Sequence, residues 1–298
     1  MPSATLRDMP QHLRLVEGAG GLPMLDVCNA HATARLSVYG AQVLAFRPTG
    51  AAADLLFLSE RAAYQPGKAI RGGVPVCWPW FGPDPQGLGR PAHGLARTRL
   101  WTLRHAAALP CDETQIVMGL SDSAETRALW PHAFDLSLTV TVGATLKLAL
   151  STHNAGDTTF AITQALHSYF SVGDIAQTRV SGLDGRRYID RAQGAGGAQK
   201  IQCGDITLPG EVDRIYAEAP AELCIEDGAG QRRIRISTEG SRTAVVWNPG
   251  AILAAGMPDL PDDAYRRFVC VETANVGDEV ITLAPGARHT LVAEIALV

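Results

Sequence analysis

Two segments of the chain place arginines and a histidine among glycines, prolines and aromatic residues. Residues 70–82 read IRGGVPVCWPWFG, and residues 91–97 read PAHGLAR. Such sequences suit neither a helix nor a regularly paired strand, so we expect a shaped surface here. The guanidinium groups of Arg71 and Arg97 match phosphate or carboxylate oxygens, and the tryptophans offer flat apolar faces on which a sugar can stack. Together with His93 they indicate a pocket for a charged polyol; the alternative is an irregular core loop with solvated arginines at its rim.

Three further polar residues lie in runs with strand-like alternation. His167 lies in ALHSYF, Asp213 in EVDRIY and Glu272 in VCVET. A carboxylate in an apolar strand is costly to bury without a partner, so we expect Glu272 either at a strand tip in water or in a functional cleft. The alternatives are a hydrogen-bonded core histidine at His167 and an ordinary surface turn at Asp213.

The elements that must position these residues are mostly strands. Residues 134–142 alternate strictly between apolar and polar, and after Gly143 the pattern resumes over 146–150, which predicts an antiparallel hairpin. Shorter runs of the same kind cover 34–46, 160–170, 232–237, 243–247, 268–272 and 289–297. Helical patterns are limited to one or two turns at 122–129 and 261–267. We therefore predict an all-β fold, a large antiparallel β-sandwich with a few short helices.

Composition and charge narrow the class of protein further. Of the 298 residues 46% are hydrophobic, enough for a large core, and without a linker or repeat we expect a single domain over residues 1–298. The net charge of −4 is dispersed, so we expect no nucleic-acid or membrane partner. Residues 1–8 lack the basic and apolar pattern of a secretory leader, and no run is long enough to span a bilayer. Cytoplasmic residence is the resulting expectation.

Cysteine spacing and glycine-rich motifs argue against a bound cofactor. The six cysteines are far apart, without a Cys-x-x-Cys pair, which predicts reduced, buried thiols and no metal site. The glycine-rich stretches at 82–89 and 193–199 are expected to be surface loops, and neither matches a nucleotide-binding fingerprint. We expect no metal and no organic cofactor.

Taken in order, the segments resemble the aldose-1-epimerase superfamily and, within it, the hexose-6-phosphate branch, the glucose-6-phosphate 1-epimerases. The matching segments are RGGVP with the following WP, HGLAR, LHSYF, VDRIY, VWNP and CVE. The resemblance implies the galactose mutarotase-like supersandwich fold. It also implies interconversion of the α and β anomers of glucose 6-phosphate and other hexose 6-phosphates.

By this resemblance, His167 falls on the family's general acid and Glu272 on its general base. Such a pair suits ring opening, because a base takes the proton of the C1 hydroxyl while an acid protonates the ring oxygen O5. We expect the two groups on opposite sides of the sugar.

The resemblance places Arg71 and Arg97 on residues that recognise the phosphorylated sugar, with His93 and Asp213 lining the sugar site. A bidentate arginine matches the geometry of a phosphate group, which carries close to two negative charges. The sequence departs from the family pattern at three positions. Ala92 stands where glutamine is common, Gly250 where a bulky aromatic residue is common, and Thr273 where proline is common.

Other functions remain open at this point. A mutarotase of unphosphorylated aldoses would use the same acid and base without the arginine pair. A sugar-phosphate-binding protein would keep the pocket without needing an acid opposite a base. A glycoside hydrolase would need two carboxylates flanking the bond. The partner is expected to be a small-molecule hexose 6-phosphate bound by a monomer, with a dimer left open.

Overall fold

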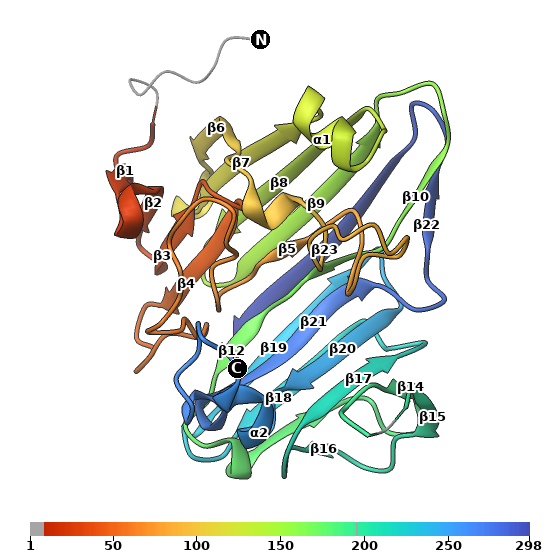
Figure 1. The fold of residues 1–298 in the computed structure, drawn as a ribbon. Coiled ribbons are helices and arrows are strands. Elements are labelled where there is room, and N and C mark those ends of the chain that lie inside the picture. The colour runs from red at the N-terminus through yellow and green to blue at the C-terminus, as the bar shows by residue number, and fades with distance from the viewer. Residues whose placement is uncertain (1–8, 195) are drawn as a thin grey trace.

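The computed structural model describes residues 9–194 and 196–298 and is built mainly of antiparallel sheets (Figure 1). The expected absence of a leader rests on residues 1–8, which lie outside the described residues. The predicted antiparallel β-sandwich is confirmed by two large sheets and two small ones. None of the described helices is long and apolar enough to cross a membrane.

The larger sheet has nine strands. In spatial order these are β16 (Ile206–Thr207), β13 (Thr178–Ser181), β18 (Glu222–Asp227), β19 (Arg232–Glu239), β23 (Arg288–Leu297), β9 (Leu146–Asn154), β8 (Phe134–Val142), β7 (Thr114–Ser121) and β6 (Thr102–Ala108). It contains the predicted hairpin, in which β8 has the predicted bounds and β9 continues four residues beyond them. Alternate side chains of both strands are buried, as period-two patterning requires.

The second sheet has eight strands. Seven follow in the order β15 (Ala198–Ile201), β14 (Arg187–Asp190), β17 (Val212–Tyr216), β20 (Thr243–Asn248), β21 (Phe268–Asn275), β11 (Gln164–Leu166) and β5 (Val76–Cys77), and β12 (Tyr169–Ser171) also pairs with β21. All eight residues of β21 are buried, so this strand is covered on both faces. Side chains on one face pack toward the nine-stranded sheet, which leaves the other face for a site.

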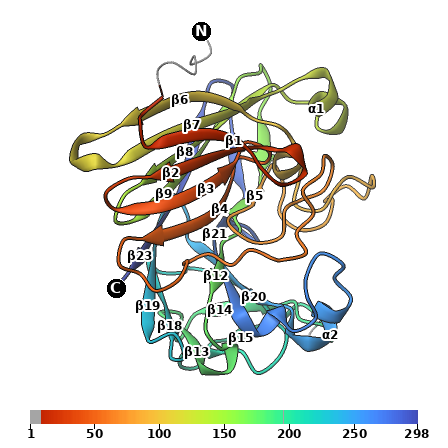
Figure 2. The ribbon, with the colours of Figure 1, turned by 90° about the vertical axis from the view of Figure 1, so that its left-hand side faces the viewer.

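Two small sheets and a few short helices complete the fold. The strands are β1 (Leu13–Glu17), β2 (Pro23–Cys28), β3 (Ala32–Ser37) and β4 (Gln42–Pro48) in one sheet, and β10 (Phe160–Ile162) and β22 (Ile281–Leu283) in the other. Figure 2 shows β1–β4 beside β8 and β9, where β3 contacts β8. The α-helices are α1 (Ala124–Leu129) and α2 (Gly250–Ala255), and short 3₁₀ turns occur at Ala19–Gly21, Ala96–Thr98, Pro110–Asp112, Ile175–Gln177 and Ala264–Arg267.

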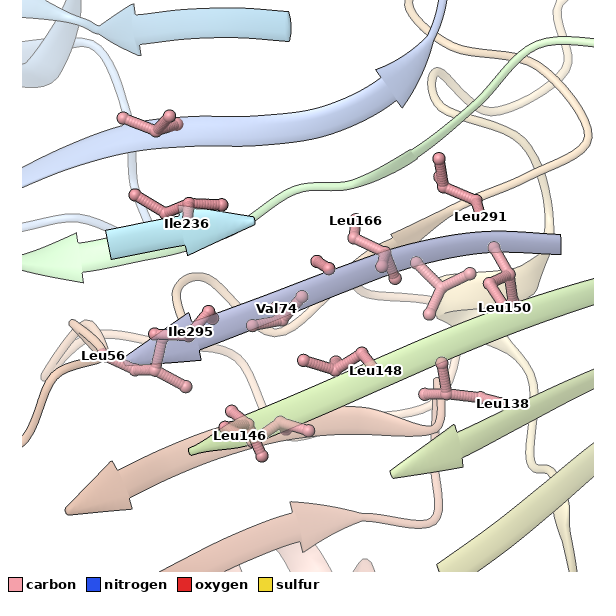
Figure 3. Packing of buried hydrophobic residues seen from close by; sticks show 14 of the residues in the cluster. Leu56, Val74, Leu138, Leu146, Leu148, Leu150, Leu166, Ile236, Leu291 and Ile295 are labelled. Carbon is pink, nitrogen blue, oxygen red and sulfur yellow. The ribbon is translucent and has the colours of Figure 1, made fainter. Parts of the chain in front are cut away.

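One apolar cluster joins the sheets and fixes the direction of the site residues. It includes Leu148 of β9, Leu166 of β11 and Val74, which lies just before β5 (Figure 3). Val271 of β21 belongs to the same cluster. Burying a side chain of this size contributes about 1.5–3 kcal/mol. Because neighbouring residues of an extended chain point to opposite faces, the residues that follow Leu166 and Val271 point away from this core.

Several local predictions need correction. The run 34–46 is a hairpin of β3 and β4, and the run 160–170 is divided into three strands. The predicted helical turn at 261–267 is a 3₁₀ turn limited to Ala264–Arg267, and helix α2 was not predicted. The stretch 193–199 is not all loop, because β15 begins at Ala198.

The cysteine prediction is only half right. All six thiols are free, but Cys28, Cys111 and Cys203 are exposed. Cys77 and Cys270 are buried, and Cys224 is half-buried. Exposed cysteines lie at strand ends and turns here, where the apolar neighbours in the sequence do not determine burial.

Candidate active site

The centre of the site is the contact between His167 and Glu272. His167 follows β11 and its backbone N–H donates to the Pro75 carbonyl at 3.0 Å. Glu272 lies in the middle of β21, beside Val245 of β20. The His167 Nε2 atom is 3.3 Å from Glu272 Oε1, and both side chains are at least nine-tenths buried. Of the two expectations for Glu272, a strand tip in water is wrong.

Burial changes the proton affinity of both groups. It lowers the pKa of the His167 imidazole well below its usual value, with the positive charges of Arg97 and Arg71 adding to the effect. It raises the pKa of the Glu272 carboxyl well above its usual value, and the charge of Asp213 adds to this. His167 Nδ1 and Glu272 Oε2 are buried and have no hydrogen-bond partner among residues 9–194 and 196–298. Both groups therefore have bonding capacity left for a ligand.

Tyr169 supports the imidazole ring from one side. Its ring stacks on that of His167 with centroids 4.8 Å apart and planes 13° apart. The Tyr169 hydroxyl accepts a hydrogen bond of 3.0 Å from Arg71 Nη1. Asp259 Oδ2 lies 3.1 Å from both Nε and Nη2 of Arg71. Arg71 is thus fixed by two partners at the edge of the site.

His93 and Arg97 come from a loop held close against the chain at Trp78. His93 has φ of 63°, and the next residue, Gly94, has φ of 75°. A Cβ on Gly94 would lie 2.0 Å from the Trp78 carbonyl oxygen, so only glycine fits this approach. Arg97 Nη2 donates to the Ala92 carbonyl at 2.9 Å. The irregular backbone predicted here is what brings both side chains to the cavity.

His93 is neutral in this setting. The Gly82 backbone N–H donates to its Nδ1 atom at 3.3 Å, which leaves the proton on Nε2. Burial, together with the positive charges of Arg97, Arg71 and Arg191, lowers the pKa of His93 to about 3. His93 can therefore donate one hydrogen bond to a ligand without carrying a charge.

The cavity of about 390 Å³ gathers all six residues expected from the sequence. They are Arg71, His93, Arg97, His167, Asp213 and Glu272. Its floor is formed by adjacent strands, because Asp213 of β17 is paired with Trp247 of β20. Asp213 is therefore not in a surface turn, and burial raises the pKa of its carboxyl.

The aromatic surface of the cavity differs from the prediction. Trp78 is fully buried in the core and donates from Nε1 to Thr152 Oγ1 at 3.0 Å. Trp80 is also buried, and it donates to the Pro91 carbonyl. Phe81 and Trp247 line the cavity instead. Side-chain direction in an irregular segment follows no period, so the sequence could not distinguish these aromatic residues.

A third arginine at the cavity was missed in the sequence. Arg191 lies directly after β14, and its backbone N–H donates to the Asp213 carbonyl at 2.7 Å. It is distant in sequence from the other arginines, and nothing in its immediate sequence indicates that it reaches the site. The described residues contain no group of three or more histidine, cysteine, aspartate or glutamate side chains placed to hold a metal ion.

The three residues that depart from the family pattern lie in different parts of the structure. Ala92 lines the cavity and supplies a backbone acceptor to Arg97. Gly250 has φ of 60°, and a Cβ there would lie 2.6 Å from the Glu211 backbone nitrogen, so a bulky side chain does not fit. Thr273 contacts Thr238 through their hydroxyls, 2.9 Å apart, on the face of β21 opposite Glu272.

Comparison with known proteins agrees with this geometry. The family model for aldose 1-epimerase matches residues 23–296. The chain belongs to the aldose 1-epimerase family. This epimerase is 42% identical over 255 residues to a protein of Escherichia coli (strain K12) named "Putative glucose-6-phosphate 1-epimerase", covering 85% of this chain and 83% of that protein. A protein of Cenchrus ciliaris with the same name is 34% identical over 282 residues, 91% of this chain and 84% of its own.

A solved structure shares the architecture of this epimerase. The crystal structure of a "putative mutarotase" from Salmonella typhimurium superposes with a TM-score of 0.86 at 34% identity, covering 96% of each chain. The resemblance stated from sequence motifs, the supersandwich fold and the assignment to the isomerases are confirmed.

Proposed function

We propose that this epimerase interconverts the α and β anomers of glucose 6-phosphate, and of other hexose 6-phosphates, through the open-chain sugar. The observation that carries the proposal is the 3.3 Å contact between His167 and Glu272 in a cavity that also holds Arg97. An acid and a base in contact are what ring opening requires. The arginines supply what an anionic sugar requires.

The reaction needs one proton transfer at each of two oxygens bonded to C1. Glu272 takes the proton of the C1 hydroxyl, and His167 donates a proton to O5 as the C1–O5 bond breaks and C1 becomes a carbonyl. Rotation about C1–C2 turns the other carbonyl face toward the O5 hydroxyl. Attack by O5 then closes the ring, with the proton of O5 returning to His167 and that of Glu272 to O1. No atom or charge is left over.

The buried pair favours the proton count that this cycle uses. With a single proton in the pair, the carboxyl with neutral imidazole and the carboxylate with imidazolium both carry no net charge, so burial disfavours adding or removing a proton. The carboxylate with imidazolium is the form that starts ring opening. Each of the two proton transfers is worth about a hundredfold to ten-thousandfold in rate.

The substrate's phosphate is assigned to the arginine side of the cavity. Arg71 and Arg97 are its anchors in this proposal, with His93 and Asp213 binding the sugar. Arg97 has no acidic partner within the described residues, whereas Arg71 is paired with Asp259. A hexose 6-phosphate carries about two negative charges, and these offset the positive charge here.

The proposal also includes cytoplasmic residence and a single domain. A doubly charged sugar phosphate cannot cross the hydrocarbon core of a membrane unaided, which supports cytoplasmic residence. The main apolar cluster includes residues from Leu13 to Ile295, which supports a single domain.

The test compares a sugar with its 6-phosphate. Exchange between the anomeric proton signals is measured by NMR at equilibrium for glucose 6-phosphate and for glucose, each with and without enzyme. We expect enzyme-catalysed exchange with a kcat/KM at least about tenfold higher for the phosphate. Equal values would support a mutarotase of unphosphorylated aldoses. No catalysed exchange with either sugar, despite binding, would support a sugar-phosphate-binding protein.

A further inference from the structure

Arg191 lines the cavity between two separate parts of the chain. Its backbone is tied to β17 by the hydrogen bond to the Asp213 carbonyl, on the sheet side. On the other side, a Cβ placed on Gly82 would lie 3.7 and 3.8 Å from Arg191 Nη1 and Nη2. The guanidinium group therefore lies next to Gly82, at ordinary contact distance from the position of such a Cβ.

The charge of Arg191 acts on the Asp213 carboxyl, whose pKa it lowers against the effect of burial, but the two groups form no ion pair. Among the described residues no carboxylate forms an ion pair with it, whereas Arg71 is paired with Asp259 and Arg90 with Asp84. Arg97 likewise forms no ion pair among the described residues, and its side chain donates to the Ala92 backbone carbonyl. The positive charge of Arg191 is felt inside the cavity, because it helps to lower the pKa of His93.

His93 lies beside the part of the cavity where an anion would meet the charges of Arg97 and Arg191. Its Nδ1 is bonded to the same Gly82 that lies next to Arg191, so its Nε2 proton faces the remaining space. Arg97 and Arg191 thus bring two charges that form no ion pair among the described residues to the part of the cavity beside His93, whose Nε2 proton is left for the sugar. An anion of two charges fits this part of the cavity better than an uncharged hydroxymethyl group.

We propose that Arg191 is a third phosphate-binding residue, which closes the mouth of the cavity over the 6-phosphate and makes this epimerase select the dianion. This inference rests on the proposed function. Arg191 contributes through binding and substrate choice, and the acid and base act without it. Because the guanidinium is exposed before binding, its attraction for phosphate is screened by salt.

The test replaces Arg191 by methionine, which removes the charge and keeps much of the length, and by lysine, which keeps the charge. We expect Arg191→Met to lower the ratio of kcat/KM for glucose 6-phosphate to that for glucose by about tenfold, since one charge-assisted contact is lost. Arg191→Lys should recover part of this loss. Inorganic phosphate should inhibit the wild type competitively and Arg191→Met about tenfold more weakly.

Salt dependence separates phosphate binding from a merely structural role. The KM of the wild type for glucose 6-phosphate should rise with ionic strength more steeply than that of Arg191→Met. The matched control is Arg187→Met. Arg187 is the first residue of β14, four residues before Arg191, and it is exposed and pairs with Glu218. It should leave the ratio and the salt slope unchanged.

The outcomes distinguish this inference from the proposed function. If the wild type does not prefer the phosphorylated sugar, the proposed function fails. If the wild type prefers it, and Arg97→Met loses the preference while Arg191→Met keeps both the ratio and the salt slope, Arg191 is not a phosphate ligand. Equal losses for Arg191→Met and Arg187→Met would also overturn the inference, because they would show a general effect of surface charge.

Discussion

His167 Nε2 and Glu272 Oε1 lie 3.3 Å apart, side by side at the floor of one cavity. The expectation from the sequence was that acid and base would lie on opposite sides of the sugar. In the structure the two side chains are in contact. The arrangement agrees with the proposed chemistry, because O1 and O5 are bonded to the same carbon and an adjacent pair can reach both oxygens from one side.

The first prediction concerns turnover. Replacing His167 by Asn or Glu272 by Gln removes one proton transfer and little volume, so kcat for glucose 6-phosphate should fall by at least about a hundredfold. The measurement is NMR exchange between the anomers, with circular dichroism to verify the fold. His153→Asn is the matched control, since His153 lies on β9 outside the cavity. Near wild-type turnover in either variant would remove that residue from the mechanism.

The second prediction concerns the stability cost of the buried carboxyl. The pKa of Glu272 is raised in the folded protein, so the folded state binds its proton more tightly than the unfolded state. The free energy of unfolding therefore falls as pH rises above the ordinary carboxyl value of 4.5. Glu272→Gln resembles the protonated form, so its Tm should exceed that of the wild type at about pH 8.

The difference in Tm between Glu272→Gln and the wild type should shrink as pH approaches the ordinary carboxyl range, where Glu272 is protonated in both states. Thermal melts at several pH values provide the measurement. A glutamine variant that is less stable than the wild type at every pH would show that the carboxylate is compensated by interactions not seen here.

The sequence predicts the strands better than it predicts the direction of side chains in irregular segments. β8 could be predicted with its bounds because apolar residues alternate there without a break, and burial follows that alternation. His167 and Glu272 could be located because their neighbours Leu166 and Val271 belong to the core. Their contact could not be predicted, because it depends on the pairing of β11 with β21.

The arginines that line the cavity could be predicted from the sequence only where they belong to a recognisable motif. Arg71 and Arg97 lie in such motifs, whereas Arg191 reaches the cavity through the pairing of β14 with β17. Trp78 and Trp247 show the same limit in another way. Both are large aromatic residues next to proline or asparagine, and only tertiary packing places one in the core and the other at the substrate.

The third prediction concerns the pH dependence of kcat/KM. The active pair holds one proton in total, so the acid limb reports addition of a second proton and the basic limb reports loss of the first. Burial lowers the pKa of His167, which moves the acid limb below the usual histidine value of 6.5. It raises the pKa of Glu272, which moves the basic limb above the usual carboxyl value of 4.5. The plot of kcat/KM against pH should be bell-shaped, and both of its limbs should report protonation of the His167–Glu272 pair as a unit.

The substrate's own ionisation must be separated from that of the enzyme. The second pKa of a phosphate is about 6, so it adds an acid limb with glucose 6-phosphate. Glucose 6-sulfate keeps one charge over this range and serves as the control substrate. An acid limb that disappears with the sulfate would be assigned to the phosphate, and an acid limb above 6.5 with the sulfate would contradict a lowered His167 pKa.

The last prediction separates the two arginines expected from the sequence. Arg97 is held by one backbone carbonyl, so Arg97→Met should lower the preference for glucose 6-phosphate over glucose by about tenfold and leave Tm nearly unchanged. Arg71→Met should lower the same preference, but it also leaves half-buried Asp259 and the buried Tyr169 hydroxyl without their partner. Its Tm should therefore fall, by an amount that Asp259→Asn reproduces in part. If both arginine variants lose stability but keep the preference, the two arginines only brace the loop, and other residues recognise the phosphate.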